Sequence, residues 1–138
     1  MPVFVGLALA LGVGVFGTWV GFDRDRAFYP TVLIVVASYY CLFAVMAGAT
    51  SILPVEMAFL LLFGALAAVG FRLSLWLVVF GLAAHGVFDL IRGDLITNPG
   101  VPLWWPVWCL AYDVAAAAYL AWRLVSSSNA VNMQAQRG

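Results

Sequence analysis

Residues 73–91 read LSLWLVVFGLAAHGVFDLI, an apolar run of about the length that one helix needs to cross the hydrocarbon core of a membrane. The run contains two ionisable residues, His85 and Asp89. An ionisable group at membrane depth costs about 2.5–3.5 kcal/mol even on lenient insertion scales. The stretch therefore predicts a membrane-spanning helix that carries two residues with a functional reason to be there.

Four further apolar runs accompany this one, separated by short breaks that contain Pro, Gly or Arg. The runs are continuous rather than alternating, which favours helices over a barrel, because a helix satisfies its own backbone groups in lipid. The sequence predicts an all-α polytopic membrane protein, a five-transmembrane-helix bundle in a single domain of residues 1–125. The expected spans are 3–21, 28–48, 55–70, 73–91 and 103–124, and a polar, disordered C-terminal tail is expected over 126–138.

Composition excludes two classes of protein. With 66% hydrophobic and 9% charged residues among 138, the chain cannot cover a soluble globule with polar surface. Its net charge is zero, and it has no Lys, so nucleic acid is not an expected partner. Cys41 and Cys109 both fall inside apolar runs and predict no disulfide framework.

Arginine placement predicts the orientation in the membrane. In a five-span chain one side carries Arg24, Arg26, Arg72, Arg123 and Arg137, and the other side carries only Arg92. The positive-inside rule then puts the N-terminus outside and the C-terminus in the cytoplasm. We expect a multi-pass protein of a bacterial-type inner membrane.

Helical spacing predicts a polar site between the last two spans. His85 and Asp89 are four residues apart and share a helix face, as do Trp105, Cys109 and Asp113. Span two adds two tyrosines whose hydroxyls could bond a buried carboxyl. The expected ligand-binding residues are Tyr39, Tyr40, His85, Asp89, Trp105, Cys109, Tyr112 and Asp113.

Several polar and aromatic features of the sequence also have a simpler structural explanation. His85 with Asp89 could be only an intrahelical hydrogen-bonded pair that lines the bundle. The indoles Trp104, Trp105 and Trp108 fit an interfacial aromatic belt, with Trp105 as a ligand lid in the alternative interpretation. Glu56 follows Pro54 at a helix start, where a capping role is expected. The run 23–26 is expected to be a solvated turn of mutually paired charges.

The sequence predicts neither a metal nor a cofactor. It has no Gly-rich phosphate loop, no zinc-type spacing and no Ser-centred elbow. A mononuclear site from His85, Asp89 and Asp113, with Cys109 or Glu56, is chemically conceivable. The ligands of such a site would differ in softness, and a single histidine gives little support for a metal site.

The pair His85-x-x-x-Asp89 resembles the His-x-x-x-Glu pair in a helix of the emopamil-binding protein family, small membrane bundles that include sterol isomerases. The likeness covers five residues, with Asp in place of Glu. It implies one chemistry, in which a histidine and a carboxyl in a dry pocket donate and remove protons on a lipophilic substrate.

The sequence thus favours a protein that binds or transports a small lipophilic ligand in the outer half of the bundle. The first alternative is an intramembrane acid–base enzyme, isomerase-like, with His85, Asp89 and Asp113 as catalytic residues and an isoprenoid, sterol or quinone-like substrate. The second is an assembly subunit of a larger membrane complex. Membrane lipid is an expected partner in every case, and a homo-oligomer remains open.

Overall fold

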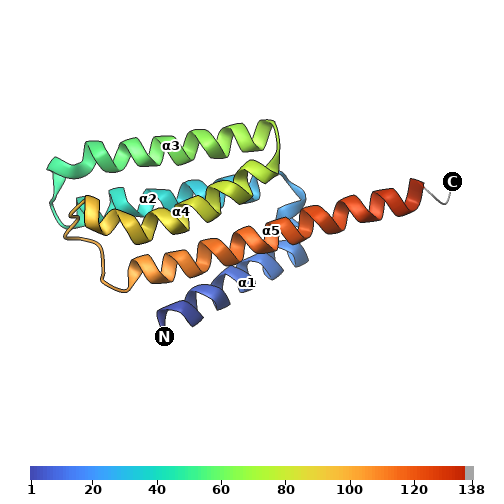
Figure 1. Cartoon of the computed structure of the whole chain (residues 1–138), viewed down its shortest axis with the longest axis horizontal. Helices are drawn as coiled ribbons and strands as arrows, with labels where there is room; N and C mark the ends of the chain where they lie inside the picture. Colours follow the sequence, from blue (N-terminus) through green and yellow to red (C-terminus); the bar gives the residue numbers. More distant parts are fainter. Residues whose placement is uncertain (136–138) are drawn as a thin grey trace.

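The computed structural model describes residues 1–135 as a bundle of helices joined by short connections (Figure 1). Helix accounts for 86%, and the described part of the chain contains no strand, so the all-α prediction is confirmed. The elements are α1 (Pro2–Val20), the 3₁₀ turn η1 (Phe22–Arg24), α2 (Phe28–Met46), the 3₁₀ turn η2 (Thr50–Ile52), α3 (Leu53–Arg72), α4 (Leu75–Leu95) and α5 (Trp105–Ala135).

Four helical segments are long and apolar enough to cross a membrane: α1, α2, Thr50–Arg72 with η2 and α3, and α4. They indicate a membrane protein. Among the described helices α5 is the longest, yet it does not belong to this group. Asp113 and several Trp and Tyr residues lower the hydropathy of its first half, and Ser and Asn residues lower that of its second half.

Helix α5 is the common neighbour that joins the two sides of the bundle. It packs against α4 and against α1, while α3 lies against α2 and α4 (Figure 1). Gly6 permits the contact between α1 and α5, because a Cβ there would lie 2.5 Å from the carbonyl oxygen of Trp108. Small residues at helix interfaces allow this close approach in membranes.

The Arg-bearing connections meet at one end of the bundle. The Nε–H of Arg26 donates to the carbonyl oxygen of Phe71 (3.2 Å), which joins the α1–α2 connection to the end of α3. Asp23 accepts from the Thr18 hydroxyl (2.6 Å) and pairs with Arg123 of α5 (3.1 Å). The expectation of a solvated turn over 23–26 is wrong for Asp23, whose side chain is only 2% exposed because α5 passes beside it.

The last two helices extend beyond their expected ends. Helix α4 continues to Leu95 rather than to residue 91, and α5 continues to Ala135 rather than to residue 124. The segment expected as a disordered tail is therefore helical as far as Ala135, and the end of α5 projects past the other helices (Figure 1). No Gly or Pro interrupts the chain there before Gly138, so nothing stops the helix. Residues 136–138, including Arg137, lie outside the described residues.

Candidate functional site

A group of polar side chains is buried at the end of the bundle opposite the Arg26 contact. Four helices and the α4–α5 connection supply them, and each is at most 9% exposed. They are Tyr40 of α2, Glu56 of α3, His85, Asp89 and Arg92 of α4, Asn98 of the connection, and Cys109 and Asp113 of α5.

Four of these side chains form a compact cluster between α4 and α5, which we call the His–Cys–Asp cluster: His85, Asp89, Cys109 and Asp113. The Nδ1 atom of His85 lies 2.7 Å from Oδ2 of Asp113 and 3.5 Å from Oδ2 of Asp89. The Sγ atom of Cys109 lies 3.7 Å from the same Asp113 oxygen. The spacing of four residues on each helix aligns the pairs. Gly86 lets the helices approach, since a Cβ there would lie 3.2 Å from the Asp113 Cβ.

The two tyrosines of α2 have different environments. The hydroxyl of Tyr40 donates to Oδ1 of Asp89 at 2.6 Å, which ties α2 to α4. This is the hydrogen bond that the sequence suggested for a buried carboxyl. The ring of Tyr39 instead lies against the indole of Trp105, with centroids 4.8 Å apart.

Glu56 and Arg92 form a buried ion pair that the sequence analysis missed. Glu56 lies in the first turn of α3, as expected, but the two side chains are 1% and 2% exposed, so its main partner is Arg92 rather than water. The α4–α5 connection folds over them, and the Asn98 amide donates to Oε1 of Glu56 (2.8 Å) and to the carbonyl of Tyr40 (3.1 Å). The Arg92 guanidinium also stacks 3.8 Å from the centre of the Tyr40 ring. The sequence did contain a signal for this pair: Arg92 was the one arginine expected on the side of the membrane opposite the other five.

Trp105 points inward rather than into an interfacial belt. It is 6% exposed, and its ring lies 4.8 Å from those of Tyr39 and Phe43 of α2, measured between centroids. Trp104 is 50% exposed, as an interfacial residue would be. Trp104 therefore fits the belt interpretation, whereas Trp105 packs against α2.

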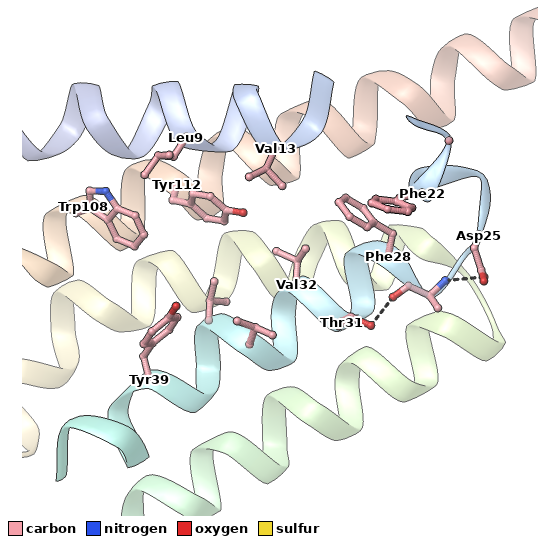
Figure 2. A pocket seen from close by; sticks show the side chains of 14 residues that line it. Leu9, Val13, Phe22, Asp25, Phe28, Thr31, Val32, Tyr39, Trp108 and Tyr112 are labelled. Atoms are coloured by element: carbon pink, nitrogen blue, oxygen red, sulfur yellow. Dashed lines mark hydrogen bonds between the residues drawn. The ribbon is translucent and has the colours of Figure 1, made fainter. Parts of the chain in front are cut away.

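A cavity of about 590 Å³ opens between α1, α2 and α5. Figure 2 shows Leu9 and Val13 of α1 facing Val32 and Tyr39 of α2, with Trp108 and Tyr112 of α5 on the inner wall. Phe22, Asp25 and Phe28 border the end nearest the α1–α2 connection (Figure 2). The lining is mostly apolar, with the hydroxyls of Tyr39 and Tyr112 among its polar groups.

The expected ligand-binding residues do not line this one cavity together. Only Tyr39 and Tyr112 do, whereas the His–Cys–Asp cluster, Tyr40 and Trp105 are buried elsewhere in the bundle. The close approach of α4 and α5 at Gly86 is the reason, because it leaves the cluster closed between the helices. Tyr112 and Asp113 are nevertheless successive residues of α5, so the cavity wall adjoins the cluster.

The chain matches no protein-family model, no curated protein and no solved structure. The five-residue likeness of His85 and Asp89 to the emopamil-binding protein family thus has no wider match behind it.

The ion pair at Glu56 yields a stability prediction. Arg92→Met leaves the buried carboxylate unpaired, and we expect it to lower the free energy of unfolding by about 3–5 kcal/mol. The double variant Glu56→Gln/Arg92→Met removes both charges while Gln keeps an acceptor for Asn98, so most of the loss should be recovered. Unfolding titrations in detergent micelles measure both values. A double variant as unstable as Arg92→Met would contradict the buried pair.

Proposed function

We propose that this chain is a multi-pass membrane protein that binds a small lipophilic ligand in the cavity between α1, α2 and α5. The cavity itself carries the proposal. Its volume of about 590 Å³ falls within the range of about 300–1,000 Å³ that is usual for small-molecule sites. Such sites are largely apolar, with a few polar groups that orient the ligand.

The polar groups of the cavity suggest what kind of molecule fits. Tyr39 and Tyr112 can each donate or accept one hydrogen bond, and the aromatic faces of Trp108 and Phe28 offer flat apolar contact. Asp25, near the α1–α2 connection, is the one charged residue of the lining. An uncharged molecule with a large apolar body and a hydroxyl or carbonyl group would suit this lining. The proposal is that the protein binds this ligand. A transport function would also require the protein to release the ligand on the other side of the membrane.

The proposed topology has five spans, with the N-terminus outside and the C-terminus in the cytoplasm of a bacterial-type inner membrane. Helix α5 packs against both α4 and α1, so a membrane that contains those helices would also enclose the first half of α5. The contact between Arg26 and the end of α3, and that between Asp23 and Arg123, gather the arginines at one end. The positive-inside rule supports a cytoplasmic location for that end. The His–Cys–Asp cluster then belongs to the outer half.

An intramembrane acid–base enzyme is the second candidate function. The observation in its favour is that Asp113, paired with His85, directly follows the cavity-lining Tyr112. A proton could reach a ligand in the cavity only after α5 turned or shifted. The assembly-subunit alternative has less support, because the buried carboxyl groups of Asp89, Asp113 and Glu56 each have a hydrogen-bond partner within the chain.

A matched pair of α1 variants tests ligand binding. Val13 lines the cavity, whereas Val15 lies two residues away and is 57% exposed. Val13→Trp should fill the cavity and abolish the adduct that native mass spectrometry detects on the gently purified protein, while Val15→Trp should keep it. Equal occupancy in both variants, or a wild-type protein with no bound small molecule or lipid, would refute the proposal.

Reporter fusions test the topology. Green fluorescent protein fused after Gly138 should fluoresce, and alkaline phosphatase fused at the same position should be inactive, because each reports on a different side of the membrane. The same two reporters fused before Met1 should give the reverse pattern. A C-terminal phosphatase that is active would overturn the orientation, and the same pattern at both termini would overturn the odd number of spans.

A further inference from the structure

The His–Cys–Asp cluster presents four potential metal ligands of three chemical kinds. One ring nitrogen, one sulfur and two carboxylate oxygens lie within 4.8 Å of one another, and all four side chains are buried. Zinc accepts this mixture of nitrogen, sulfur and oxygen ligands in a tetrahedral arrangement. The candidate ligands differ in softness, which on the sequence alone counts against a metal. This difference matters less for zinc, which is of intermediate softness, than for harder or softer ions.

Two of the observed separations match the edges of a zinc tetrahedron, and the four ligand atoms all lie within 4.8 Å of one another. Zinc–ligand bonds of about 2.0–2.3 Å place neighbouring ligand atoms about 3.3–3.8 Å apart. The Nδ1 atom of His85 lies 3.5 Å from Oδ2 of Asp89, and Sγ of Cys109 lies 3.7 Å from Oδ2 of Asp113. The 2.7 Å contact between His85 and Asp113 would have to open by less than about 1 Å to accommodate the ion.

Two buried oxygens of the cluster have no hydrogen-bond partner among the described residues. They are Oδ2 of Asp89 and Oδ1 of Asp113. The Nδ1 atom of His85 carries at most one proton, which can serve Asp113 or Asp89 but not both. A buried carboxylate oxygen without a partner is costly, and it calls for a cation or a proton. An ion in the arrangement described above would meet Oδ2 of Asp89 directly, and it would meet Oδ1 of Asp113 when that carboxylate turns or binds through both oxygens.

The charge of the wider polar group also favours a divalent cation. Glu56, Asp89 and Asp113 contribute three negative charges when ionised, and Arg92 contributes one positive charge. With a neutral imidazole two negative charges remain uncompensated in a region closed to water. One divalent ion balances these two charges; when the ion also displaces the thiol proton of Cys109, which is released, the thiolate leaves one net negative charge at the site.

We propose that His85, Asp89, Cys109 and Asp113 bind one divalent metal ion of the zinc type between α4 and α5. Tyr40 is a positioning residue for this site, because its hydroxyl occupies Oδ1 of Asp89 and leaves Oδ2 free for the ion. The ring of Phe63 lies 4.8 Å from that of His85 and helps to exclude water. The metal site does not depend on the proposed ligand in the neighbouring cavity.

Metal loading of the intact protein tests the site directly. The full chain is purified in detergent, stripped with a chelator and incubated with Zn²⁺ or Co²⁺ alone. We expect one ion per chain by elemental analysis, and with Co²⁺ a sulfur-to-metal charge-transfer band from Cys109. A folded wild-type protein that retains no stoichiometric Zn²⁺ or Co²⁺ would overturn the proposal, and would leave a shared proton as the means of balancing the carboxylates.

Matched variants separate this site from adventitious binding. Cys109→Ser should lose the charge-transfer band, whereas Cys41→Ser should keep it, because Cys41 lies outside the cluster. Tyr40→Phe should weaken Zn²⁺ binding by about 10–100-fold, as changes beside a metal ligand do, and Tyr39→Phe should not. A band that survives in Cys109→Ser, or equal Zn²⁺ affinity in the two tyrosine variants, would contradict the assignment.

Discussion

Hydrogen bonds and ion pairs between buried polar side chains of different helices shape the interior of this protein. Lipid offers no hydrogen bonds, so Asp89, Asp113 and Glu56 must be met by other side chains. The Tyr40 hydroxyl meets Asp89, His85 meets Asp113, and Arg92 with Asn98 meets Glu56. These contacts link α2, α3, α4 and α5, and they add specificity to helices whose apolar surfaces would pack in many ways.

The cavity and the His–Cys–Asp cluster are two neighbouring features with different chemistry. The cavity is mainly apolar and opens between α1 and α2, whereas the cluster is polar and closed between α4 and α5. Helix α5 connects them, because Tyr112 lines the first and Asp113 belongs to the second. The proposed ligand site and the proposed metal site can each exist without the other.

Much of this arrangement could be predicted from residue spacing alone. The apolar runs indicated five helices, and intervals of four residues placed His85 with Asp89 and Cys109 with Asp113 on facing stripes. Spacing could not show that the α4–α5 connection folds back, since that depends on Asn98 reaching Glu56 and Tyr40 across the bundle. Residue spacing also could not locate the cavity, because that depends on how closely the helices pack. The contact of Gly86 with α5 closes the predicted pocket, and the cavity instead lies where α1 packs mainly on α5.

The central claim is that side chains from different helices satisfy one another in the interior, and the bond from Tyr40 to Asp89 is its clearest case. A double-mutant cycle with Tyr40→Phe and Asp89→Asn, read by unfolding free energies in micelles without added metal, measures that bond directly. The structure predicts a coupling energy of about 1 kcal/mol or more between the two positions. Additive effects, within about 0.3–0.5 kcal/mol, would contradict the network.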